Sequence, residues 1–194
     1  MPGQDPTPRL IVVTGRPGSG KTTLAHKLAR AAHCPLISRD ELKEGYVNTG
    51  YDAGPPAGEP NRHIYAVFFD TLRQLLTQGV SLVAEAAFQH KAWAPGLEPL
   101  LELADLRIVI CEVDPQHARD RRVQRGLNNP NRERFHADPD VAIARAGGAP
   151  PPGVYDPPRL DAPTLTVDTA DGYAPGFDQI LAFVGQGLRF HPPA

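Results

Sequence analysis

A glycine-rich phosphate-binding loop near the start of the chain constrains its fold more than any other feature. Residues 15–22 read Gly-Arg-Pro-Gly-Ser-Gly-Lys-Thr, which matches G-x-x-x-x-G-K-[ST] at every fixed position. The apolar run 10–14 precedes the loop and predicts a buried strand, while apolar residues at helical spacing follow it. Strand, loop and helix in this order direct backbone N–H groups and the positive helix end at a phosphate. The alternative is a glycine-rich turn without a ligand, which the complete motif in this context disfavours.

The loop therefore predicts a bound nucleoside triphosphate, taken to be ATP, together with Mg²⁺. We expect Lys21 to reach the β- and γ-phosphates and the Thr22 hydroxyl to bind Mg²⁺. The residues expected to hold the nucleotide are Gly15, Pro17, Gly18, Ser19, Gly20, Lys21, Thr22 and Thr23.

Composition excludes several other classes. The net charge of −2 argues against a general nucleic-acid binder, although a local basic patch remains open. Two cysteines, Cys34 and Cys111, are too few for a disulfide framework, so we expect a cytoplasmic protein. No apolar run approaches the roughly 20 residues that span a membrane. Residues 1–8 are expected to form a flexible leader and residues 9–190 one domain.

Apolar strands alternate with amphipathic helices along the chain, which predicts an α/β fold. About five strands would form a parallel sheet with helices on both faces, a three-layer sandwich of the P-loop NTPase type. The strands are expected at residues 10–14, 35–38, 80–84, 106–113 and 164–167. Ligands of such sheets bind beyond the carboxyl ends of the strands, so functional residues are expected there.

The segment after the second expected strand reads Ser-Arg-Asp-Glu-Leu-Lys over residues 38–43. Asp40 would face the γ-phosphate region, where a carboxylate can accept the proton of an attacking hydroxyl. Lys43 follows one helical turn later and would steady the substrate or the transferred group. The alternative makes Asp40 a helix N-cap and Lys43 a solvated charge.

Glu85 ends the expected strand 80–84 within an apolar setting. An acid at this point can orient the Mg²⁺ shell through water or contact the acceptor substrate. The alternative is a structural ion pair with a nearby lysine or arginine. Because a buried charge is costly unless it is paired or functional, we favour the functional interpretation.

An arginine-rich stretch within residues 115–147 predicts a lid that closes over the nucleotide. Arg121 and Arg125 are spaced i, i+4 and share a helix face, so both could neutralise the charge of phosphoryl transfer. A solvated helix balanced by Asp114 and Asp120 is one alternative, and a nucleic-acid contact is another.

Taken together, the loop 15–22, the segment 38–43, Glu85 and the Arg121-x-x-x-Arg125 pair resemble the small P-loop kinases. This group includes bacteriophage polynucleotide kinase, zeta toxins, chloramphenicol phosphotransferase and gluconate kinase. The resemblance implies that Asp40 is a general base and that Arg121 and Arg125 are lid arginines. It also implies that Asp168 borders the adenine or ribose.

Two departures from polynucleotide kinases affect the expected acceptor. Lys43 stands where that branch has arginine, so the bidentate fork that suits phosphate is lost. Glu85 and the residues after it resemble the zeta-toxin and antibiotic-kinase side instead. The acceptor hydroxyl therefore stays open between a small molecule and a nucleic-acid 5′ end. Residues expected to line its site, besides Asp40, Lys43 and Glu85, are Tyr46, Tyr51, Asn61, His63, Phe88, His90 and Trp93.

Other nucleotide-binding classes fit less well. A GTPase would carry Asn-Lys-x-Asp, which is absent, and an AAA-type motor would be longer and carry an Asp-Glu pair. A nucleoside monophosphate kinase stays open, although its arginine arrangement is not evident. A non-kinase ATPase or an ATP-binding switch would keep Lys21 and Thr22 but would not need Asp40.

Overall fold

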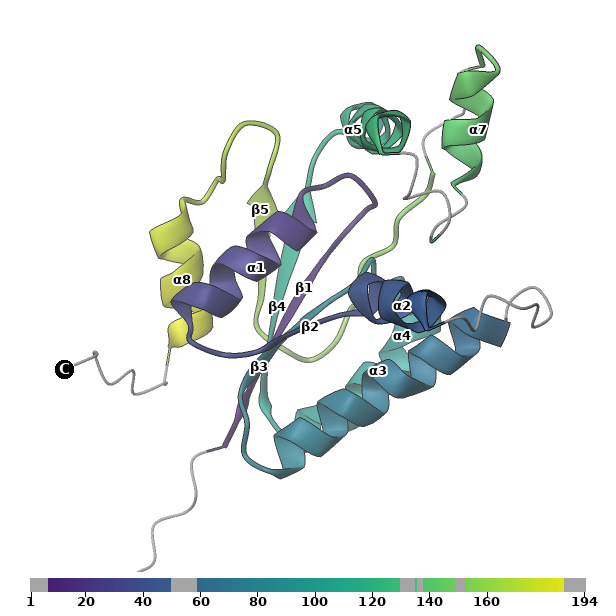
Figure 1. Ribbon diagram of the computed structural model, residues 1–194. Coiled ribbons are helices and arrows are strands. Elements are labelled where there is room, and N and C mark those ends of the chain that lie inside the picture. Colours follow the sequence, from purple (N-terminus) through teal and green to yellow (C-terminus); the bar gives the residue numbers. More distant parts are fainter. Residues whose placement is uncertain (1–6, 50–58, 130–134, 136–137, 149–152, 187–194) are drawn as a thin grey trace, which may run out of the picture.

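A five-stranded parallel sheet forms the centre of the molecule (Figure 1). The computed structural model describes residues 7–49, 59–129, 135, 138–148 and 153–186. The strand order is β2-β3-β1-β4-β5, and every neighbouring pair is parallel. The strands are β1 (Arg9–Gly15), β2 (Leu36–Ser38), β3 (Leu82–Glu85), β4 (Asp105–Glu112) and β5 (Thr164–Asp168). The predicted parallel sheet is confirmed.

Helices cover both faces of this sheet, as the three-layer prediction requires (Figure 1). Alternate residues of a strand point to opposite faces, so β1 contributes to two cores. Ile11 and Val13 pack with α1 (Lys21–Ala31) and α8 (Phe177–Gly185). Leu10 and Val12 pack on the other side with α3 (Glu59–Thr77). Buried on both faces, β1 holds the phosphate-binding loop on a rigid base.

The remaining helices are α2 (Arg39–Asn48), α4 (His90–Leu97), the 3₁₀ turn η1 (Glu98–Glu102), α5 (Pro115–Asn128) and α7 (Pro139–Arg145). In Figure 1, α5 and α7 stand beyond the carboxyl ends of the strands, where the lid was expected. They pack closely, because a Cβ at Gly126 would lie 2.4 Å from Val141 Cγ2. None of the described helices is long and apolar enough to cross a membrane.

The region 88–96 corrects an expectation about the acceptor site. Phe88 is fully buried and packs edge-on against Trp93, with ring centroids 4.8 Å apart. Both rings also contact Phe68 of α3, so Phe88 belongs to the core and the partly buried Trp93 packs against it. Tyr51 lies outside the described residues.

The free energy of unfolding is expected to fall as the pH rises above about 9, because burial raises the pKa of the Cys34 and Cys111 thiols. The pKa of Cys34 rises from 9.0 to about 11 and that of Cys111 to about 12. Above the unfolded pKa and below the folded one, only the unfolded chain has released the proton, so rising pH favours unfolding. Thermal unfolding between about pH 8 and 11 should show a falling midpoint, and Cys34→Ala should make the fall shallower. An unchanged midpoint over this range would contradict the expectation.

Candidate active site

Strand register brings three functional segments together at one edge of the sheet. Glu85 is in register with Val13 on β1 and with Ser38 on β2. The phosphate-binding loop starts two residues after Val13, and α2 starts one residue after Ser38. The end of β3 therefore lies between the loop and the first turn of α2.

The loop 15–22 has the backbone geometry that phosphate binding requires. Gly18 and Gly20 have φ angles of 90° and 81°, which disfavour any residue with a side chain. A Cβ at Gly18 would also lie only 2.0 Å from the carbonyl oxygen of Ala118. Gly20 is the N-cap of α1 and provides no side-chain hydrogen bond. The Ser19 hydroxyl is buried and has no hydrogen-bond partner among the described residues. The glycine cradle and the start of α1, which has no side-chain cap, fit a triphosphate.

Glu85 links the loop to α2 through a buried network. Its side chain is 1% exposed. Its Oε1 accepts a hydrogen bond from Thr22 Oγ1 at 3.1 Å and lies 3.7 Å from Lys21 Nζ. Its Oε2 accepts one from Ser38 Oγ at 2.7 Å. Glu85 therefore lies beside the expected Mg²⁺ ligand Thr22.

A cavity of about 490 Å³, here called the central cavity, opens between the loop, α2 and the two lid helices. The loop contributes Pro17, Lys21 and Thr22. The charged lining residues from the helices are Arg39, Asp40, Glu41 and Glu44 of α2, Arg122 and Arg125 of α5, and Asp138 at the start of α7. Glu85 and Lys43 are not among the lining residues.

Asp40 faces this cavity, and the structure does not use it as a helix cap. The N-cap of α2 is Ser38, whose side chain accepts a bond from the Glu41 backbone. Asp40 is 42% exposed and pairs with Arg39, whose Nη1 lies 3.1 Å from Asp40 Oδ1. Arg39 also donates to Asn61 Oδ1 of α3 at 2.7 Å. The N-cap alternative for Asp40 is therefore wrong.

Lys43 is half-buried on α2 and does not line the central cavity. Burial lowers the pKa of its ammonium group, the nearby Arg39 lowers it further, and Asp40 opposes the shift. Its predicted contact with the substrate has no counterpart in the lining of this cavity.

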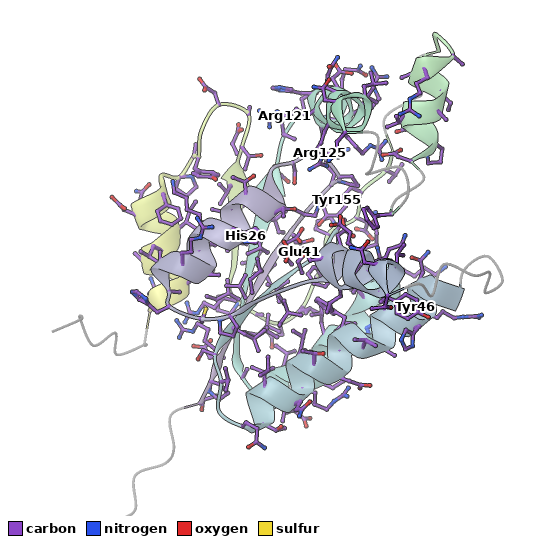
Figure 2. All side chains as sticks on the ribbon, in the orientation of Figure 1. His26, Glu41, Tyr46, Arg121, Arg125 and Tyr155 are labelled. Atoms are coloured by element: carbon purple, nitrogen blue, oxygen red, sulfur yellow. The ribbon has the colours of Figure 1, made fainter. Side chains whose placement is uncertain are left out.

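The arginines of α5 contact different parts of the molecule. Arg121 donates to the backbone oxygens of Thr169 and Ala170, at 3.0 and 2.6 Å, in the loop after β5. Arg125 and Arg122 line the central cavity instead. Figure 2 shows Arg121 on the side of α5 toward β5 and Arg125 below the helix. Both Arg121 and Arg122 lie within one turn of Arg125, so helical spacing alone did not distinguish them.

Arg122 was not singled out from the sequence, and its partners explain its position. Its Nε lies 3.3 Å from Asp138 Oδ2, and its Nη2 pairs with Asp140. Asp138 is also the N-cap of α7. The pairing thus connects the two lid helices at the edge of the central cavity.

Asp168 and Thr169 at the end of β5 differ in what they contact. The Asp168 carboxylate accepts the backbone N–H of Ala170 at 2.7 Å and is solvent-exposed. Thr169 is buried, and its hydroxyl donates to Ser19 O at 2.6 Å and contacts Glu112 O at 2.9 Å. Thr169 therefore contacts the phosphate-binding loop, whereas the Asp168 side chain hydrogen-bonds within the turn that follows β5.

Two side-chain pairs fix α2 relative to its neighbours. His26 of α1 lies 2.7 Å from Glu41 of α2, and the two residues face each other in Figure 2. Tyr46 of α2 packs on His63 of α3 with ring centroids 4.9 Å apart.

His90, another residue expected at the acceptor site, accepts the backbone N–H of Arg159 through its ring nitrogen.

The carboxylates here do not form an all-protein metal cage. Among the described residues no three His, Cys, Asp or Glu side chains are placed to hold one ion. Mg²⁺ in phosphoryl-transfer sites is usually held by few protein ligands together with nucleotide phosphates. Thr22, with Glu85 behind it, fits that mode.

Comparison with known proteins identifies the family of this chain. A family model described as "AAA domain" matches residues 10–141. A curated relative is the ATP-dependent protease ATPase subunit HslU of Methylobacterium radiotolerans, 31% identical over 88 residues. That match covers 45% of this chain and only 20% of the relative, so the chain spans about a fifth of its length.

Solved structures resemble the chain over nearly its whole length. One, from Chloroflexus aurantiacus, is described as a "putative kinase"; it is 28% identical, with a TM-score of 0.67 over 94% of this chain and 100% of that one. The APS kinase of Mycobacterium tuberculosis is 20% identical, with a TM-score of 0.61 over 93% and 97% of the two chains. The second likeness shows the fold alone. The family model and the shared architecture place this chain in the AAA domain family, with the fold of the P-loop kinase group.

Proposed function

We propose that this protein is an ATP-dependent phosphotransferase that moves the γ-phosphoryl group to a hydroxyl of an acceptor. One observation carries the proposal. The central cavity brings the phosphate-binding Lys21, a carboxylate at Asp40 and the cations Arg122 and Arg125 to one space. A protein that only bound ATP would have no need of the carboxylate.

The phosphate-binding loop would hold the donor. Backbone N–H groups around Gly18 and Gly20 would cradle the phosphates, and Lys21 would leave Glu85 to reach the β- and γ-oxygens. Thr22 would hold Mg²⁺, which when bound supplies neutralising charge at the phosphates.

Asp40 would act on the acceptor. The acceptor oxygen attacks the γ-phosphorus, its proton passes to the Asp40 carboxylate, and the bond to the β,γ-bridging oxygen breaks to release ADP. Arg39, bonded to Asp40 and to Asn61, would fix the direction of the carboxylate.

Arg122 and Arg125 would neutralise charge on the transferred group. Charge-assisted contacts in a water-poor site usually supply a large part of catalysis in phosphoryl transfer. The structure also supports a change in the expected lid pair from Arg121 and Arg125 to Arg122 and Arg125. Arg121 and Thr169 would instead form the wall next to the nucleoside.

The second candidate is a non-kinase ATPase or ATP-binding switch. The match to part of an ATPase subunit over 88 residues favours it. Incubation with γ-labelled ATP separates the two functions, since a phosphotransferase labels an alcohol whereas an ATPase releases only labelled phosphate.

Nucleotide binding is expected to weaken when Gly18 acquires a side chain. Gly18→Ala places a methyl group at a φ of 90° and against the Ala118 carbonyl, so the loop must shift. Titration calorimetry with Mg-ATP should show affinity reduced by about tenfold or more. Gly45→Ala is the matched control, because a Cβ at Gly45 meets nothing within 4 Å. Equal affinities in the two variants would contradict the assigned loop geometry.

Asp40→Asn is expected to lower kcat by about 10²- to 10⁴-fold while the Kd for ATP changes little, because the amide cannot accept the proton. Lys21→Ala should abolish transfer altogether. Transfer of label to acceptor and ATP binding would be measured on the same preparations. Full turnover in Asp40→Asn would contradict the general-base role.

A further inference from the structure

A second, smaller cavity lies next to the central cavity and is here called the arginine cavity. Its volume is about 170 Å³. Its polar lining comes from Arg16, Gln89, Arg119, Arg122 and Tyr155. Pro17 and Arg122 line both cavities, so a ligand in one cavity lies next to the other.

The lining includes three arginines and, among the described residues, no aspartate or glutamate. Arg119 pairs with Asp120, and Arg122 pairs with Asp138 and Asp140, all of which lie outside this lining. Arg16 differs from both. Its Nη1 donates to the backbone oxygen of Gly153 at 3.2 Å, and within the described part of the chain it forms no ion pair. Among the described residues, the positive charge of Arg16 is therefore left without an ion-paired carboxylate.

Of the two cavities that Arg16 borders, the arginine cavity is the more favourable for an anion. Arg16 also borders a third cavity, of about 500 Å³, which is lined by Glu112, Asp114 and Asp168. Those carboxylates would repel an anion, and none of them forms an ion pair with Arg16. An anionic ligand is therefore favoured on the arginine side of the loop.

The neutral lining groups are held in place by the protein. The Tyr155 hydroxyl lies 2.6 Å from Thr14 Oγ1, and burial raises the pKa of Tyr155 to about 12, so it stays uncharged at neutral pH. The Gln89 side-chain oxygen accepts the backbone N–H of Asp156 at 2.9 Å. Figure 2 shows Tyr155 below Arg125, at the loop end of the sheet. Within the described residues, the cavity thus has two hydrogen-bonded neutral side chains in its wall and one cation without an ion-pair partner.

We infer that the arginine cavity binds an oxyanion group carried by a small acceptor, such as a phosphate ester, while the acceptor hydroxyl lies at Asp40. This inference rests on the proposed phosphotransferase function. The volume is below the roughly 300 Å³ of a typical whole-ligand site, so the cavity suits one group of the acceptor. The planar fork of arginine matches the geometry of phosphate and carboxylate oxygens.

The test uses matched acceptors that differ in one phosphate: glycerol against glycerol 3-phosphate, and ribose against ribose 5-phosphate. The full chain with Mg-ATP is expected to show a higher kcat/KM for the phosphorylated member of at least one pair. Arg16→Met should raise KM for that member by about 10- to 100-fold and remove the preference. Arg16→Lys keeps the charge but loses the fork, so it should retain part of the preference.

Arg73→Met is the matched control, because Arg73 is an exposed residue of α3 that pairs with Asp70. It should keep the full preference for the phosphorylated acceptor. Thermal unfolding of each variant verifies folding. Equal kcat/KM for both members of every pair would overturn the inference and leave the proposed function standing. A preference for a 5′-hydroxyl oligonucleotide over the small phosphate esters would overturn the small-molecule source of the oxyanion.

A separate measurement covers the case in which no acceptor is labelled, which would contradict the proposed function. Inorganic phosphate would then be titrated into the Mg-ADP-loaded protein. Weaker binding to Arg16→Met than to the unmodified chain would support an oxyanion subsite at Arg16. Equal binding to both proteins would overturn it.

Discussion

The buried carboxylate of Glu85 is the group on which the site depends. A charged carboxylate in a protein interior is costly unless it is paired and hydrogen-bonded, and here Lys21, Thr22 and Ser38 surround it. These three residues come from the nucleotide loop and from the end of β2. One side chain at the end of β3 thus joins three segments that are distant in sequence. Removing one partner of such a buried pair typically costs about 3–5 kcal/mol. Nucleotide binding must therefore supply Lys21 with replacement partners, and phosphate oxygens are suitable ones.

The two carboxylates at the strand ends have different environments, and this difference supports different roles. Glu85 is 1% exposed and held by two hydroxyl donors and an ion pair with Lys21, so it is suited to orient Lys21 and Thr22 and poorly placed to meet an acceptor. Asp40 is 42% exposed, lines the central cavity and has a cation, Arg39, at 3.1 Å. Of these two carboxylates, Asp40 is the one that can contact a ligand in this cavity without breaking the buried network.

The sheet and the nucleotide loop could be predicted from the sequence because both depend on local patterns. Apolar runs mark the five strands, and the loop motif fixes its own backbone. The course of residues 88–97 could not be predicted in this way. Pro95 and Gly96 both disfavour a helix interior, so the sequence does not indicate α4 there. A Cβ at Gly96 would lie 2.4 Å from the Phe69 ring, so tertiary packing determines that residue. Phe88 and Trp93 resembled ligand contacts for the same reason, since the sequence does not show that α3 covers them.

The lid arginines show that helical spacing alone cannot predict which arginine faces the central cavity. Consecutive residues of a helix point about 100° apart, so Arg121 and Arg122 can each share a face with Arg125 but cannot face the same target. The rotation of α5 is determined by long-range contacts: Ala118 lies against Gly18 of the loop, and Gly126 lies against Val141 of α7. These two contacts direct Arg121 to the carbonyls after β5 and leave Arg122 at the central cavity. Because Arg122 is paired with Asp138 through Nε and with Asp140 through Nη2, a phosphoryl group that takes these two nitrogens must displace those carboxylates. The position of α7 and the charge on the ligand are coupled for that reason.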